Sequence, residues 1–100
     1  MTIDTATLLN ARLRLPEHVV HRTFVVETVV LNLETGKYHG LNATAGRMLD
    51  VLNEAPSVRD AATTIAQEYG EEQATVEADL AVFCRDLLDR KLMEIVDDTG

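Results

Sequence analysis

Residues 27–42, with the sequence ETVVLNLETGKYHGLN, constrain the fold of this chain more than any other stretch. The stretch begins with apolar residues at every second position, which is typical of a β-strand. The tetrapeptide ETGK is predicted to be a turn, because Gly36 can take the positive φ that closes a tight hairpin. Residues 38–41 are predicted to form a short return strand, and Asn42 ends it with a side chain that can cap a following helix. A return strand at a sheet edge carries unpaired backbone groups, so this hairpin indicates a binding surface.

The sequence leaves the register of this hairpin open. If the turn has two residues, Tyr38 faces the same side of the sheet as Leu33. If the glycine of the turn forms a bulge, His39 and Leu41 share the side of Leu31 instead. We favour the bulge, because Leu41 leads directly into the next helix and is expected to be in the core.

Three apolar stripes follow the hairpin and predict three helices, at residues 43–54, at residues 57–69, and from between 71 and 75 to about residue 90. Gly46 weakens the first of these helices, which indicates that a close packing neighbour requires it. Residues 19–24 are rich in Val, Thr and Phe and predict a further strand before the hairpin. The core stripe of the third helix is predicted to consist of Val76, Leu80, Phe83 and Leu87. The order predicts an α+β domain, a three-stranded antiparallel sheet followed by three helices, with a winged-helix outline.

The length of 100 residues corresponds to one domain, which we expect to span residues 16–96. Residues 1–15 are predicted to be an N-terminal arm, whose leucines either pack against the domain or serve as an arm apart from it. Pro16 breaks any helix at that point. Residues 92–96 are apolar and are expected to be a short strand or strut, and residues 97–100 a C-terminal tail.

The residues that usually carry catalysis are few and poorly placed. Ser57 is the only serine and stands where a helix needs a cap. Cys84 lies in an apolar helical stripe, where a thiol is normally an inert core residue. His18 and His21 are expected to point to opposite faces of a strand, which makes them a poor metal pair, and His39 stands alone. We therefore predict a protein that is not an enzyme and that holds neither a cofactor nor a metal ion.

Acidic residues outnumber basic ones, seventeen to nine, and give a net charge of −8. This charge repels nucleic acid and anionic membranes, whereas it suits a basic partner or serves solubility alone. The alternative function for this outline is a winged-helix regulator that binds nucleic acid with its last helix. Between residues 76 and 90 that helix carries four carboxylates against two guanidinium groups, which disfavours contact with phosphates.

The single cysteine excludes an internal disulfide and fits a reducing compartment, so we expect the protein in the cytoplasm. Residues 1–15 have neither the basic start nor the apolar run of a signal peptide, and no other segment predicts a membrane span. We therefore expect neither a membrane nor a nucleic acid among the partners.

The run VVLNLETGKYHGLNATA, residues 29–45, resembles the PqqD-like proteins, also called recognition elements for ribosomally synthesised and post-translationally modified peptides (RiPPs). The later pattern of this family also fits at Leu49, Leu52, Ser57, Val58, Ile65, Ala66, Tyr69, Gly70, Val76, Asp79, Leu80, Phe83, Leu87 and Leu92. The resemblance covers about residues 16–96. The turn ETGKY and the helix start GLNAT depart from the members that act in quinone synthesis. The chain looks closer to the stand-alone adaptors of lasso-peptide pathways.

The resemblance implies a non-catalytic adaptor, a peptide chaperone that binds the leader segment of a ribosomally made precursor peptide. In such proteins the leader adds as a strand to the edge of the third strand and lies against the third helix. The adaptor presents the leader to a maturation enzyme, such as a leader peptidase, a cyclase or a radical-SAM protein. The partners implied here are therefore a precursor peptide and one of these enzymes.

The return strand and one flank of the third helix are the peptide-binding site that the resemblance implies. The alternative flank carries Cys84 and Leu88, and the sequence does not decide between the two. We favour the first flank, because its carboxylates could pair with a basic leader residue. The candidate residues are Lys37, Tyr38, His39, Gly40, Leu41, Asp79, Val82, Phe83 and Asp86.

Overall fold

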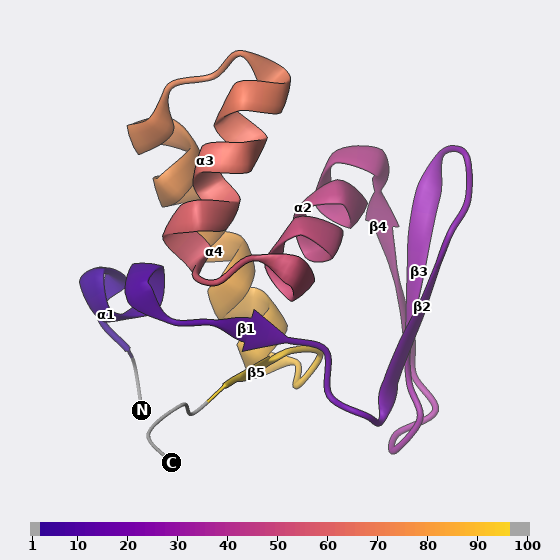
Figure 1. Ribbon diagram of the computed structural model, residues 1–100. Coiled ribbons are helices and arrows are strands. Elements are labelled where there is room, and N and C mark those ends of the chain that lie inside the picture. The colour runs from indigo at the N-terminus through magenta and orange to yellow at the C-terminus, as the bar shows by residue number, and fades with distance from the viewer. Residues whose placement is uncertain (1–2, 97–100) are drawn as a thin grey trace.

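The computed structural model describes residues 3–96, and the expected tail at 97–100 lies outside them. Strands β2, β3 and β4 form one antiparallel sheet that stands beside the helices, and β1 pairs with β5 (Figure 1). The predicted α+β fold, a three-stranded antiparallel sheet followed by three helices, is confirmed, whereas α1 and β1 were not predicted. In chain order the elements are α1 (Thr5–Asn10), β1 (Leu13–Arg14), β2 (Val19–Thr23), β3 (Glu27–Asn32), β4 (Tyr38–Asn42), α2 (Ala43–Glu54), α3 (Val58–Tyr69), α4 (Gln73–Asp89) and β5 (Glu94–Ile95).

The register of the β3–β4 hairpin is not the one that the sequence favoured. Leu31 pairs with Tyr38 and Thr28 pairs with Leu41, and the pairing runs unbroken between them. His39 and Leu41 therefore share the side of Thr28. The prediction of a bulge, which placed these residues on the side of Leu31, is wrong. Tyr38 lies on the side of Leu31, as the alternative turn implied. Leu41 nevertheless packs against the core, as expected.

Asn32 is the physical reason for this register. Its side chain is buried and accepts hydrogen bonds from the N–H groups of Glu34 and Thr35, at 2.9 and 3.3 Å. Its carbonyl accepts the N–H of Gly36 at 2.8 Å, and its N–H donates to the Lys37 carbonyl at 2.9 Å. The loop therefore needs four residues, 33–36, to satisfy a buried amide that would otherwise be costly.

Helix α2 covers one face of the sheet (Figure 1). This face carries Thr28, which lies against Gly46 of α2. Asn42 caps this helix as predicted, because its Oδ1 accepts the N–H of Ala45 at 2.8 Å. Gly46 follows within the first turn, and a Cβ at this position would lie 2.9 Å from the Cβ of buried Thr28. The prediction that a packing neighbour requires this glycine is confirmed.

We expect Gly46→Ala to lower the free energy of unfolding, although alanine is the better helix former by about 1 kcal/mol. The added methyl group overlaps Thr28, and overpacking of this kind costs about 1–3 kcal/mol. Thermal unfolding of the variant measures the net loss. The same substitution in a Thr28→Ala background should cost less, and equal losses in both backgrounds would contradict the contact as the cause.

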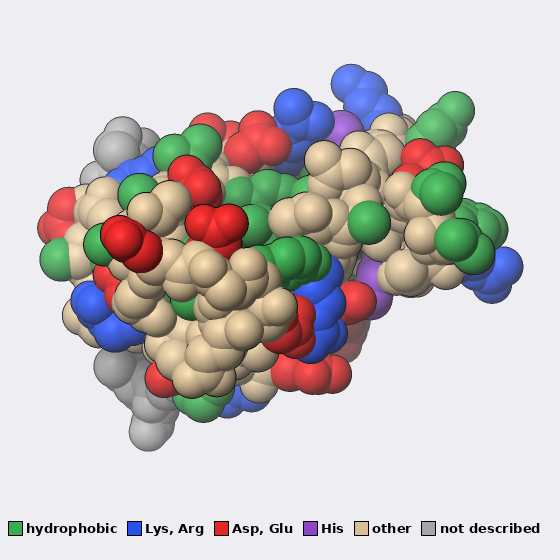
Figure 2. Space-filling model, turned by 90° about the horizontal axis from the view of Figure 1, so that it is seen from above, with side chains coloured by type: hydrophobic (Ala, Val, Ile, Leu, Met, Phe, Trp, Pro, Cys, Tyr) green, Lys and Arg blue, Asp and Glu red, His purple; other side chains and the backbone are tan. Residues whose placement is uncertain are grey.

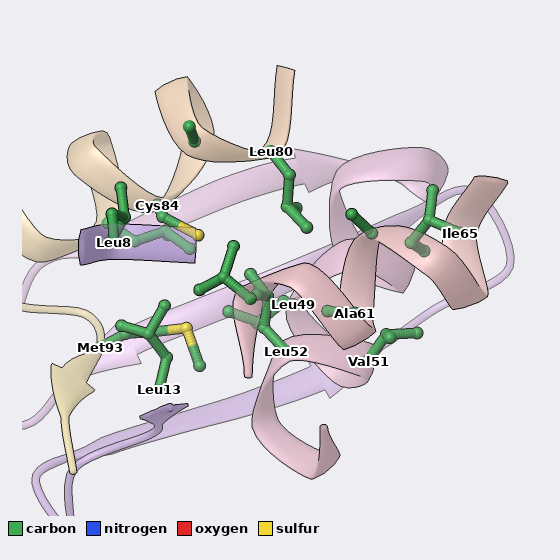
Figure 3. Close-up of a cluster of buried hydrophobic side chains, with 14 of the residues drawn as sticks. Leu8, Leu13, Leu49, Val51, Leu52, Ala61, Ile65, Leu80, Cys84 and Met93 are labelled. Carbon is green, nitrogen blue, oxygen red and sulfur yellow. The ribbon is translucent and has the colours of Figure 1, made fainter. Parts of the chain in front are cut away.

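Helices α3 and α4 begin and end close to the predicted positions. Ser57 caps α3 by accepting the N–H of Asp60 at 3.1 Å, and Gly70 ends it with a φ of 65°. The buried side chains of the helices form one aliphatic core (Figure 3). In α4 the predicted stripe is buried except at Phe83, which is only partly buried because the helix turns Cys84 toward the core.

The N-terminal segment packs against the domain, which is one of the two possibilities that the sequence left open. Leu8 of α1 and Leu13 of β1 are buried in the core. The N–H of Val58 at the start of α3 donates to the Ala11 carbonyl at 2.8 Å. Strand β1 pairs with β5, so the segment at 92–96 contains the expected short strand.

Candidate functional site

The outer edge of β4 carries unpaired backbone groups. Strand β3 lies in the middle of the sheet, and no strand within residues 3–96 pairs with the other side of β4. The bond from the Asn32 N–H to the Lys37 carbonyl shows which residues of the hairpin face each other. Because antiparallel ladders alternate, the backbone groups of residues 39 and 41 point toward β3, whereas those of Tyr38, Gly40 and Asn42 point outward. This edge is open to an additional strand.

Helix α4 approaches this edge at its C-terminal end. The Arg90 guanidinium donates to Nδ1 of His39 at 3.1 Å, and its Nε donates to Oδ1 of Asp86 at 3.0 Å. On the other side of the helix Arg85 binds the N-terminal segment, where its Nη2 donates to Oγ1 of Thr5 at 3.0 Å. The flank that carries Asp86 is therefore turned toward β4, and the opposite flank is turned toward α1.

The candidate residues of β4 divide between the two faces of the sheet. Tyr38 is 74% exposed, and its side chain lies on the face away from α2, so only its backbone faces the outer edge. His39 and Leu41 point toward the helices and are partly buried. Lys37 is exposed in the loop, and Gly40 presents bare backbone at the edge.

The candidate residues of α4 are not equivalent either. Asp79 lines a shallow cavity of about 330 Å³ between α2, α3 and α4, together with Met48 and other residues. Phe83 packs against the core, whereas Val82 is 70% exposed and projects into solvent. Asp86 forms an ion pair with its neighbour one turn later. Of these residues, the structure links Asp86 to β4, through Arg90 and His39.

Arg90 is a residue between α4 and β4 that sequence reasoning missed. A guanidinium group can only donate hydrogen bonds, so Nδ1 of His39 is the acceptor in this contact. Arg90 links β4 to Asp86 and neutralises that carboxylate. The spacing of four residues between Asp86 and Arg90 was a signal that could have indicated the pair.

Cys84 is a core residue of α4 and not a nucleophile. Burial raises the pKa of its thiol to about 12. Because the thiolate is the reactive form, we expect no alkylation of the folded protein by iodoacetamide at pH 8, and rapid alkylation in denaturant. Mass spectrometry of both samples checks this, and modification of the native protein as fast as of the denatured protein would contradict the buried placement.

The histidines have separate partners. Nε2 of His18 lies 3.3 Å from the Lys91 carbonyl, and Nε2 of His21 lies 3.2 Å from Oδ1 of Asp50. Within the described residues no three His, Cys, Asp or Glu side chains are arranged to hold a metal ion. No helix in the same range is both long enough and apolar enough to cross a membrane.

Comparisons with known proteins agree with this geometry. A structure described as TbiB1 in complex with the TbiA(beta) leader peptide has 34% identity and a TM-score of 0.76, covering 85% of this chain and 99% of that chain. A lasso peptide synthetase B1 complexed with its leader peptide has 26% identity and a TM-score of 0.75, covering 84% and 99%. The PqqD part of Methylobacterium extorquens PqqCD, described as a stand-alone RiPP recognition element, has 26% identity and a TM-score of 0.68, covering 82% and 87%.

Sequence comparison leads to the same family. Among curated proteins none matches the chain significantly. The model of the family described as coenzyme PQQ synthesis protein D (PqqD) matches residues 27–93, from the start of β3 to the residue before β5. The match covers well over half of the chain and includes the β3–β4 hairpin and all three helices of the core. This protein therefore belongs to the PqqD family.

Proposed function

We propose that this protein is a non-catalytic adaptor that binds the leader segment of a ribosomally synthesised precursor peptide and presents it to a maturation enzyme. The observation that carries the proposal is the open outer edge of β4 beside α4. Two structures similar to this chain over more than four fifths of its length are complexes with leader peptides. Strand addition uses backbone hydrogen bonds for affinity and alternate side chains for selectivity, so the proposed role needs no catalytic group.

The proposed leader site combines backbone from β4 with side chains from α4. The outward N–H and C=O groups of Tyr38 and Gly40 form the ladder with the leader strand. Phe83 offers apolar contact on α4, and His39 lies between the strand and the helix. Lys37, Leu41 and Val82 are the candidate residues at the margin of this site.

Charge in the proposed site favours Asp79 over Asp86 as the partner of a basic leader residue. Arg90 already pairs with Asp86 at 3.0 Å. Asp79 has no cationic side chain within 4.0 Å among residues 3–96 and lies beside an apolar cavity. An exposed pair of this kind contributes about 0.2–1 kcal/mol, so Asp79 tunes selectivity and the backbone ladder supplies most of the affinity.

The partner enzyme is proposed to be of the lasso type, a leader peptidase with a cyclase, in preference to a radical-SAM enzyme. This choice is supported by the TM-score of 0.75 with lasso peptide synthetase B1, against 0.68 with the PqqD structure. We propose that the protein presents the leader in the cytoplasm. Its single, buried thiol is compatible with that reducing compartment.

The alternative function is that of a nucleic-acid regulator, in which α4 would have to enter the groove of the duplex. This helix has no available cations for such a contact. Of the two guanidinium groups of α4 and its C-cap, Arg85 binds the carbonyl of Ile3 and the hydroxyl of Thr5. Arg90 is paired with Asp86. The four carboxylates of the same segment would then face phosphates without compensation.

A titration followed by backbone amide shifts tests the proposal. The probe is the synthetic leader of the precursor peptide encoded beside this gene, with a scrambled leader of equal composition as the control. We expect shifts at residues 37–42 and 79–90 with the leader and none with the control. If the shifts gather on α3 and leave β4 unmoved, the proposed site is wrong. A parallel titration with duplex DNA at physiological salt should leave the spectrum unchanged.

A further inference from the structure

The face of the sheet opposite α2 is apolar and uncovered. Val20, Leu31 and Tyr38 pair in one row across the three strands, on the side away from the helices. Val20 and Tyr38 are exposed, and Leu31 between them is partly buried. In the space-filling view, hydrophobic side chains gather on the lobe that projects from the helical body (Figure 2). Within residues 3–96 no element covers this row.

The tip of the β2–β3 hairpin extends the same surface. Residues 24–26 have the sequence FVV, and Val25 and Val26 are 97% and 75% exposed. Solvated hairpin tips are normally built from Gly, Asn, Asp, Ser and Pro. Three consecutive exposed apolar residues are unfavourable unless they serve a contact. Leu33 in the β3–β4 loop is also exposed, so apolar side chains occur at both ends of the sheet.

One cationic side chain of the strands lies at this face. Arg22 is on the same side of β2 as Val20 and has no carboxylate within 4.0 Å among the described residues. Other arginines of this acidic chain, such as Arg14, form ion pairs within the molecule. Glu27 is the one acidic residue of strands β2 to β4, and its side chain also lies on this face. Arg22 therefore indicates a partner that brings its own carboxylate.

We propose that the open face of the sheet and the β2–β3 tip form the docking surface for the maturation enzyme. This inference rests on the proposed function. The surface that binds here is apolar and carries a carboxylate at its margin that pairs with Arg22. A contiguous exposed apolar surface of this kind is typical of a protein interaction site. A second copy of this chain fits less well, because it would bring the same cation and a net charge of −8 to the contact.

The geometry explains how one small sheet serves two partners at once. The leader is proposed to extend the sheet from the edge of β4, in the plane of the strands, whereas the enzyme covers the face. The leader strand would then lie beside Tyr38, at the margin of the enzyme contact. An enzyme docked on the open face would touch both the adaptor and its bound leader, and would not need to displace the leader.

Substitutions on the open face separate enzyme docking from leader binding. Val20→Glu combined with Val25→Glu places charges in the apolar surface, and both positions are exposed, so the fold should be retained. The matched control is Thr63→Glu with Ala78→Glu, which adds the same charge at exposed positions of α3 and α4. The probe is the maturation enzyme encoded beside this gene, measured by its affinity for the leader-bound adaptor and by the rate of leader-dependent processing.

We expect the open-face variant to bind the leader with unchanged affinity but to lose at least tenfold in enzyme affinity and in processing rate, while the control variant behaves as the wild type. Arg22→Glu should weaken enzyme binding and reduce its salt dependence. Equal processing by both double variants would overturn the inference. A wild-type dimer in sedimentation that the open-face variant dissociates would also overturn it, because the surface would then join two copies. If the wild-type protein does not bind the leader at all, that result would instead contradict the proposed function.

Discussion

Replacing Gly40 by proline is expected to weaken leader binding by about 5- to 150-fold, while the protein remains folded. The N–H of Gly40 points outward from β4, toward the proposed leader strand. Proline removes this donor and sets its ring against the incoming strand. A leader carbonyl that loses its partner in a desolvated ladder costs about 1–3 kcal/mol, which corresponds to that range of affinity. Isothermal titration with the leader peptide measures the change.

Two controls make this result specific to the outward edge. Gly40→Ala keeps the N–H, and its Cβ would lie 3.5 Å from Oε2 of Glu27, an ordinary contact, so leader affinity should change little. Leu41→Pro removes an N–H that points toward β3, so it should destabilise the fold itself. If Gly40→Pro binds the leader as well as Gly40→Ala does, the leader does not add to β4.

Replacing Leu8 by alanine is expected to cost about 2–5 kcal/mol of the free energy of unfolding. Leu8 is 0% exposed, although it belongs to a segment that the sequence suggested could be an arm. The cavity left in the core cannot be filled by the short helix α1. In a domain of this size each kcal/mol lowers the melting temperature by about 4–8 °C, so calorimetry should detect the loss clearly.

Asn10→Ala is the matched control for Leu8→Ala, because Asn10 lies in the same helix and is exposed. A surface substitution of this kind should change the stability by no more than about 0.5 kcal/mol. Leader affinity should be unchanged in both variants at temperatures where they are folded, since α1 contacts the flank of α4 that faces away from β4. Similar melting temperatures for the two variants would show that the segment contributes little to the core.

The parts of the fold that were predicted correctly depend on local signals. Helix α2 begins at the Asn42 cap, and α3 lies between Ser57 and Gly70, because side chains near each end satisfy or terminate the backbone hydrogen bonds. The strands before α2 were predicted from alternation and from a turn with glycine at positive φ. These signals act over a few residues, so the sequence alone contains them.

The parts that were not predicted depend on residues distant in the chain. The register of the hairpin is set by burial of the Asn32 side chain, and burial is decided by the helices that pack on the sheet. The short helix α1 has no independent stability, and it exists because the core accepts Leu8. The contact between Arg90 and His39 joins residues 51 positions apart, so no local pattern indicates it.

The sequence by itself determined the element order from β2 to α4, the boundaries of α2, α3 and α4 and the family resemblance, and it predicted a site on a return strand and the last helix. Tertiary structure alone decided which backbone groups of β4 face outward, which flank of α4 meets this strand, and which sheet face stays uncovered. The physical reason is that periodicity and capping are properties of neighbouring residues. The direction of a side chain at an edge follows from register and packing, which are settled only when the whole core assembles.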